Sequence, residues 1–132
     1  MKRTEQREHI FKLIFGADFN EESEQGTQTE LYLEQIEGAT DKDMQYISQK
    51  AQKIIEKIDE IDTLINEHTT GWKTGRMNKV DLTILRLAVY EMKWDEDVPT
   101  GVAINEAVNL AKKYSSEDGA SFVNGVLAKL AD

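Results

Sequence analysis

The residues that could do chemistry lie at the two ends of the chain. Lys2, Arg3 and Arg7 gather in the first seven residues. Arg3 and Arg7 are four positions apart, so both guanidinium groups can face one side of an exposed helix end. Phe15 follows two turns later, and Phe122 begins the last predicted helix. Basic groups contact phosphates and aromatic faces stack on unpaired bases, which indicates RNA binding; a packed core is the other interpretation of both phenylalanines.

Metal and catalytic chemistry find little support. His9 and His68 are far apart, and neither has a second histidine at helical spacing. The Asp41–Asp43 stretch lacks the glycine and terminal glutamate of a calcium loop. The chain has no cysteine, which excludes disulfides, cysteine-bound zinc, iron–sulfur clusters and thiol catalysis. No nucleophile elbow, phosphate-cradling loop or Rossmann glycine pattern occurs. We therefore expect no enzyme, no metal and no cofactor.

Composition favours an ordinary helical domain. The chain has 132 residues, enough for one domain or two small halves that share a core. A single proline points to helices. The longest apolar run has four residues, from Leu87 to Tyr90, so no membrane span is expected. With no signal peptide, a cytoplasmic location is the simplest expectation.

The net charge of −9 argues against nucleic-acid binding, but the charges are unevenly distributed. Residues 1–12 carry a net charge of +2, and residues 13–47 carry −8. Residues 48–79 carry +1, and residues 80–132 carry −4. The acid is thus concentrated in one early stretch, and the N-terminal tip is basic.

Hydrophobic periodicity predicts an all-α fold, a compact bundle of about six to seven helices. The predicted helices span residues 3–17, 29–37, 43–68, 80–94 and 100–114, and a last helix carries Phe122 to Leu130. Residues 20–28 and 115–119 are expected to be a loop and a turn. Thr40 and Asp43 form a predicted capping box. Gly38 is expected just after a helix end, and Thr100 is expected at a helix N-cap.

Two of these helices carry specific patterns. Apolar residues recur at alternating spacings of three and four from Met44 to Ile65, which fits a coiled-coil seam or the core face of a bundle helix. Ten of the 15 residues from 80 to 94 are apolar, and they lie on all sides of the predicted helix, which is typical of a central helix. Arg86 lies within that helix, and we expect it to form an internal ion pair, with Glu106 or Glu91 as candidate partners.

The second half carries recognisable motifs. They are Gly71-Trp72, Arg76, Val80 to Glu91, Val98-Pro99, Val102 to Val108, Leu110 to Lys112, and Phe122 to Leu127. Their order and spacing over residues 71–130 resemble the NusB family of bacterial transcription antitermination factors. The N-terminal helix resembles the family more loosely.

The resemblance implies one RNA-binding domain over residues 1–132, with helical halves of about 1–70 and 71–132. It also implies a function without catalysis or cofactor. Family members pair with the ribosomal protein NusE and bind single-stranded boxA-type RNA. They help an RNA polymerase elongation complex with other Nus factors to read through terminators, notably in ribosomal RNA operons. Some relatives form a homodimer, so monomer and dimer both stay open.

The resemblance also assigns site residues. The RNA-binding positions of the family match Lys2, Arg3, Arg7, Phe15, Asp118 and Phe122. The partner-binding positions match Phe15 and Asp81. Arg86 and Glu106 match positions that we interpret as structural. Thr4 and Glu5 stand where more basic residues are common in the family. With about three basic contacts, the salt slope for single-stranded RNA is only about −2. The hypothesis is therefore weak RNA binding alone and useful binding with NusE.

Two other interpretations remain. The first is a protein-only helical adapter that self-associates through the apolar pattern of residues 44–65. The second is a NusB-like module detached from an enzyme, because similar domains precede some RNA cytosine methyltransferases. The 132 residues have no room for a methyltransferase domain.

Overall fold

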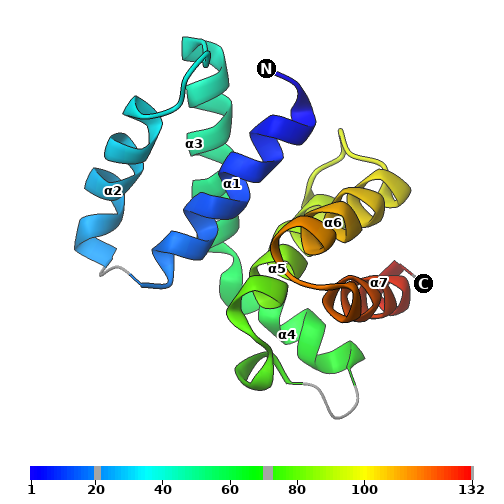
Figure 1. Ribbon diagram of the computed structural model, residues 1–132. Helices are drawn as coiled ribbons and strands as arrows, with labels where there is room; N and C mark the ends of the chain where they lie inside the picture. The colour runs from blue at the N-terminus through cyan, green and yellow to red at the C-terminus, as the bar shows by residue number, and fades with distance from the viewer. Residues whose placement is uncertain (20–21, 70–72, 132) are drawn as a thin grey trace. The chain divides into compact units, whose positions relative to one another are not determined.

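The computed structural model describes residues 1–19, 22–69 and 73–131, and within them every regular element is a helix, which confirms the all-α prediction (Figure 1). The elements are α1 (Arg3–Ala17), α2 (Glu22–Glu34), α3 (Asp41–Glu56), α4 (Ile58–His68), the short 3₁₀ helix η1 (Thr74–Arg76), α5 (Lys79–Trp94), α6 (Thr100–Tyr114) and α7 (Glu117–Ala131). The chain forms two compact units, residues 1–56 and 57–132. The Gly71-Trp72 motif lies outside the described residues.

In the N-terminal unit, α1 packs on α3 (Figure 1). Helix α1 has the predicted bounds, and its predicted stripe places Ile10 and Ile14 in the core. Ile47 and Ile54 of α3 are fully buried as well. The apolar period of each helix therefore marks the face that the other helix covers.

Helix α2 corrects two predictions. Residues 22–28, expected as a loop, belong to the helix, which ends at Glu34 rather than near residue 37. The error arose because α2 has no apolar stripe, and glutamate and glutamine favour helix without one. Gly38 has a φ of +75°, the left-handed conformation expected of it, but it lies four residues beyond the helix end.

One side-chain pair links α2 to α1. Tyr32 Oη lies 2.6 Å from His9 Nδ1, and the two rings meet edge to face at 5.8 Å. Burial lowers the pKa of His9, and the nearby Lys12 lowers it further. Both effects favour the neutral imidazole, which shares a hydrogen bond with the tyrosine hydroxyl through Nδ1.

The predicted helix from 43 to 68 is two helices, so that prediction was wrong. The chain breaks at Lys57, whose φ of −105° and ψ of 8° are not helical. Ile47 and Ile54 face the core of the N-terminal unit, whereas Ile61 and Ile65 are buried in the C-terminal unit. The apolar spacing continued through the break because it serves two cores in succession. A continuous coiled-coil seam over residues 44–65 is excluded.

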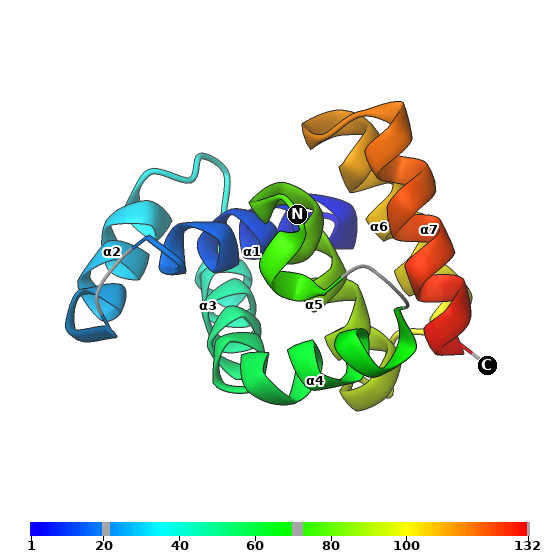
Figure 2. The same ribbon diagram turned by 90° about the horizontal axis from the view of Figure 1, so that it is seen from below.

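In the C-terminal unit, α5 is the central helix, as its all-round apolar sequence predicts. Every residue from 81 to 91 is buried, and α4, α6 and α7 pack around the helix (Figure 2). Helices α6 and α7 lie side by side as a hairpin in both views. The buried positions of that hairpin include Ala107, Leu110, Val123 and Leu127.

Arg86 is the cation inside this apolar environment, and it forms the expected internal ion pair. Its Nε and Nη2 donate to the two carboxylate oxygens of Asp62 at 2.9 and 2.8 Å. Asp62, 24 residues before Arg86, is not among the partners expected from the sequence, which were Glu91 and Glu106. This two-point pairing fixes α4 against α5 and compensates the buried charge.

Helix ends were predicted with mixed success. Thr40 and Asp43 form the predicted capping box: Asp43 N–H donates to Thr40 Oγ1 at 3.1 Å, and Thr40 N–H donates to Asp43 Oδ2 at 3.0 Å. Thr100 is the first residue of α6 rather than its N-cap, which is Pro99. The expected turn at 115–119 is shorter, since α7 already begins at Glu117. None of the described helices is long and apolar enough to cross a lipid bilayer.

The central position of α5 predicts a large cost for a cavity within it. Leu87 is about 1% exposed. Leu87→Ala should lower the free energy of unfolding by about 3 kcal/mol, measured by urea denaturation. Val102→Ala is the matched control, because Val102 is 45% exposed and should cost under about 0.5 kcal/mol. Equal losses in the two variants would contradict the central role of α5.

Candidate nucleic-acid interface

The predicted site residues fall in both units of the chain. Lys2, Arg3, Arg7 and Phe15 belong to the N-terminal unit, on α1 or directly before it. The remaining predicted residues, Asp81, Asp118 and Phe122, belong to α5 and α7 of the C-terminal unit. The structure thus offers two groups of candidate residues, one in each unit.

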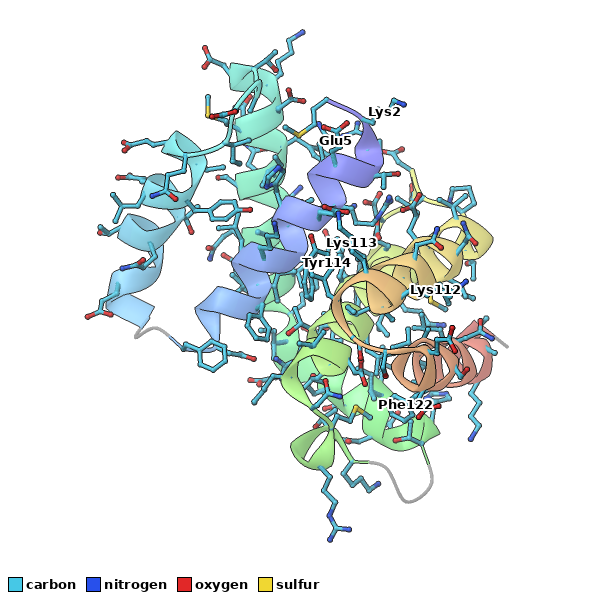
Figure 3. All side chains as sticks on the ribbon, in the orientation of Figure 1. Lys2, Glu5, Lys112, Lys113, Tyr114 and Phe122 are labelled. Carbon is cyan, nitrogen blue, oxygen red and sulfur yellow. The ribbon has the colours of Figure 1, made fainter. Side chains whose placement is uncertain are left out.

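At the N-terminal tip, Lys2 and Arg3 are exposed, and Figure 3 shows Lys2 and Glu5 at the start of α1. The Arg3 guanidinium lies 3.9 Å above the ring of Tyr46 and donates to Gln6 Oε1 at 2.8 Å. Stacking and hydrogen bonding hold this cation in place on the surface. Because Lys2 and Arg3 are both exposed, each can contact a phosphate.

Arg7 corrects the sequence expectation. It was expected on an exposed helix end beside Arg3, but only 6% of its surface is accessible. Arg7 precedes Ile10 and Ile14 by three and seven positions, so it lies on the face of α1 that turns inward. Its apolar neighbours on that face signalled its burial. Its predicted contact with RNA remains a prediction, for which the burial gives no support.

A hydrogen-bond network fixes the basic tip to α3. Gln6 Nε2 donates to Asp43 Oδ1 at 2.8 Å, and the amino group of Met1 lies 3.6 Å from Asp43 Oδ2. The backbone N–H of Thr40, donated to the carboxylate, lowers the pKa of Asp43; burial opposes this shift, and hydrogen bonds from the Thr40 and Gln6 side chains add to it. Asp43 thus stays charged and anchors the start of α1.

Aromatic rings continue from the core of α1 to its surface. Phe15 is half-buried, its ring lies 6.2 Å from that of Phe11, and Phe19 meets it edge to face at 5.1 Å. Phe11 is buried, whereas Phe19 is 65% exposed. Phe19 is not among the sequence-predicted site residues, although its spacing of four from Phe15 was an available signal that places it on the same side. Phe19 is the aromatic side chain of this series most open to a base.

In the C-terminal unit, cations accompany the predicted residues. Asp118 is exposed and Phe122 is half-buried. Lys112 and Lys113 are exposed in the last turn of α6, and Lys113 Nζ lies 5.4 Å from the ring of Tyr114. Figure 3 shows the two lysines and Tyr114 on α6, and Phe122 on α7. The two lysines are not among the sequence-predicted site residues, although two adjacent cations in an acidic half of the chain were an available signal.

A groove of about 320 Å³ lies on the surface of the α6–α7 hairpin. It is lined by Val108, Lys112, Glu117, Ala120, Ser121 and Asn124. Its polar groups are thus one amide, one hydroxyl, one ammonium and one carboxylate, in the helical turns next to Phe122. Such groups suit the polar edge of a nucleotide.

Asp81, expected to face a partner, is only 5% exposed. Its backbone N–H donates to Asn78 Oδ1 at 2.8 Å, and its Oδ2 accepts from Asn78 Nδ2 at 2.9 Å. Oδ1 has no hydrogen-bond partner among the described residues and lies 3.0 Å from where a side chain at Gly119 would begin. The structure thus gives Asp81 a local role at the start of α5, beside α7, and its partner contact remains a prediction.

The described residues contain no group of three or more histidine or acidic side chains that could hold a metal ion. The chemistry that the exposed site residues offer is therefore ionic contact, hydrogen bonding and ring stacking.

The burial of Arg7 predicts a stability defect. Arg7→Glu should lower the free energy of unfolding by about 3 kcal/mol, because it places the opposite charge at a buried position. Thermal and urea denaturation would measure the loss. Lys2→Glu is the control and should leave stability nearly unchanged, since Lys2 is exposed. A fully stable Arg7→Glu variant would show that the arginine side chain is free to leave its buried position.

The capping box of α3 predicts a pH-dependent defect. Thr40→Ala removes the acceptor for Asp43 N–H and should cost about 1 kcal/mol at neutral pH, measured by urea denaturation. Because the pKa of Asp43 is lowered in the folded state, its stabilising effect is present above the ordinary carboxyl pKa near 4 and is lost as pH falls below that value. Asp43→Asn, which removes the negative charge, should therefore destabilise the chain at neutral pH and have a much smaller effect at about pH 3. A loss of stability that does not change with pH would contradict the role of ionised Asp43.

Comparisons with known proteins agree with this architecture. The NusB family profile matches residues 4–132. The transcription antitermination protein NusB of Agathobacter rectalis is 53% identical over 99% of this chain and 100% of its own length. That of Lachnoclostridium phytofermentans is 47% identical over the full length of both chains.

Solved structures give the same result. NusB of T. maritima superposes with a TM-score of 0.85 at 30% identity, over 99% of this chain and 91% of that one. A chain from a structure of the antitermination factors NusB and NusE in complex with dsRNA has a TM-score of 0.84 at 26% identity, over 99% and 98% of the two chains. Sequence and fold agree over nearly the whole chain, which therefore belongs to the NusB family.

Proposed function

We propose that this chain is a transcription antitermination factor that, together with the ribosomal protein NusE, binds boxA-type sequence in nascent RNA. In this role it helps RNA polymerase, within an elongation complex with other Nus factors, to read through terminators in ribosomal RNA operons. The full-length match to relatives named for antitermination carries the proposal. The similarity to a NusB chain solved with NusE and RNA supports the two partners.

The exposed groups suit single-stranded RNA. Lys2 and Arg3 offer two cations in the N-terminal unit, with the Phe15–Phe19 pair as a stacking surface. The C-terminal unit offers the same combination of cations and a ring, in Lys112, Lys113 and Phe122. Each stacked base contributes roughly 1–3 kcal/mol, and each phosphate contact adds a salt-dependent term.

NusE is proposed to supply part of the affinity. The net charge of −9 opposes the approach of RNA, and Arg7 adds no exposed cation. A basic ribosomal protein would be attracted to the acidic body and would add a second basic surface. RNA affinity should therefore rise sharply when NusE is present. Such a factor needs no catalysis and acts in the cytoplasm, where transcription takes place.

The protein-only adapter is the weaker alternative. It relied on self-association through an uninterrupted apolar seam over residues 44–65. The break at Lys57 interrupts that seam, and Ile47, Ile54, Ile61 and Ile65 are fully buried. No exposed apolar stripe remains there for a second copy.

Charge reversal tests the proposed RNA surface. Lys2→Glu combined with Lys113→Glu should weaken binding of labelled boxA RNA by about tenfold or more at low salt, because two exposed phosphate contacts are lost. Fluorescence anisotropy in the presence of NusE measures the change. The matched control is Lys42→Glu with Lys129→Glu, which makes the same charge change at exposed positions of α3 and α7. Equal weakening in the two double variants would mean that only net charge matters, which contradicts the assigned surface.

A further inference from the structure

A third group of cations precedes α5, and the proposed function does not use it. Lys73, Arg76 and Lys79 recur every third residue, and no acidic residue occurs between Glu67 and Asp81. We refer to Lys73, Arg76 and Lys79 as the basic turn. All three side chains are exposed. In a chain of net charge −9, three neighbouring cations without intervening acid stand out.

The backbone of the basic turn is held in place. Thr74 N–H donates to Asn66 Oδ1 at 2.9 Å, and Lys73 Nζ donates to the Asn66 carbonyl at 3.2 Å. Met77 is buried at 8% exposure, and the Asn78 side chain caps α5. These contacts fix both ends of the segment from 73 to 79. A fixed backbone lowers the entropic cost of presenting the cations to a ligand.

The three cations lie on a short stretch of chain that ends at the start of α5. Arg76 is the last residue of η1, and Lys73 directly precedes η1. Lys79 is the first residue of α5. The side chains of Arg76 and Lys79 form no hydrogen bond or ion pair with any described residue. Their charges are therefore available to an anion.

The surroundings favour a polyanion over a protein. The exposed neighbours of the cations, Gly75 and Asn78, are small or polar, and the apolar Met77 points inward. Protein interfaces gain most of their affinity from buried aromatic and aliphatic anchors. A phosphate backbone needs only regularly placed cations. Within the described residues 73–79, the basic turn offers such cations and has no exposed aromatic or aliphatic anchor.

The basic turn is also continuous with a group of candidate RNA residues in its own unit. Lys79 lies two residues before Asp81. Asp81 Oδ1 is 3.0 Å from the position that a Cβ atom would take if Gly119 were replaced by a larger residue. The first turns of α5 and α7 are therefore in contact. Phe122 lies three residues after Gly119 on α7. Phe122 and the basic turn therefore both lie near the contact between the first turns of α5 and α7.

We propose that the basic turn binds the phosphate backbone of RNA that flanks the boxA element, independently of its sequence. The inference rests on the proposed function. It assigns Lys73, Arg76 and Lys79 to a contact that extends the RNA path without reading bases. Three phosphate contacts to single-stranded RNA correspond to a salt slope of about −2.

The test uses the full chain with NusE and two labelled RNAs. One RNA is the boxA element alone, and the other carries about ten additional unpaired nucleotides on each side. The variant is Lys73→Ala, Arg76→Ala, Lys79→Ala. The matched control is Lys42→Ala, Lys53→Ala, Lys129→Ala, which removes three exposed lysines elsewhere and changes the net charge equally. Anisotropy at several salt concentrations gives the affinities and slopes, and thermal melting checks that both variants fold.

The native chain should bind the long RNA more tightly than boxA alone. The basic-turn variant should keep its affinity for boxA alone within about twofold, lose the added affinity for the long RNA, and show a salt slope reduced by about 2. The control should keep both affinities. A basic-turn variant that matches the control on the long RNA overturns the inference. A basic-turn variant that loses affinity for NusE but keeps its affinity for the long RNA also overturns the inference, because the basic turn would then contact a protein.

A failure of the proposed function gives a different result. In that case the native chain with NusE binds boxA and a scrambled sequence equally. The difference between basic-turn variant and control on the long RNA is measured separately, so it still decides whether the turn contacts phosphates.

Discussion

Burial of α5 on every side is the constraint on which the C-terminal unit depends. A helix with eleven successive buried residues needs cover around its whole circumference. Helices α4, α6 and α7 provide that cover and are amphipathic as a consequence. The same constraint explains Asp62, because a guanidinium within this environment needs a partner that satisfies both its charge and its hydrogen bonds. The first turn of α5 then lies against α7, which bears Asp118 and Phe122.

Where packing dominates, the sequence was sufficient to predict the fold. The bounds of α1 and the central role of α5 followed from apolar spacing, since those residues face a covering helix. The capping box followed from local chemistry at Thr40 and Asp43. Helix α2 and the break at Lys57 could not be predicted in this way. Helix α2 has no apolar stripe. The break at Lys57 leaves the apolar period intact, because α3 and α4 continue the same spacing while they face different cores.

The candidate site was harder to predict because residue type says little about accessibility. Arg7 carries the right chemistry but shares the inward face of α1 with Ile10 and Ile14. Asp81 has the right charge but is used in capping α5. Phe19, Lys112 and Lys113 were missed because adjacent cations and a terminal phenylalanine are common on helix surfaces. Their exposure and grouping became evident only from the structure.

The two units present cations and rings on an otherwise acidic chain, which supports the proposal of an RNA-binding protein that depends on a partner. The most direct test compares the native chain's affinity for boxA RNA and for a scrambled RNA, each with and without NusE, at fixed salt. The account predicts weak binding of both RNAs by the chain alone, and a selective, sharp increase for boxA when NusE is added. Affinities that stay equal for the two RNAs with NusE present, or that do not respond to NusE, would contradict it.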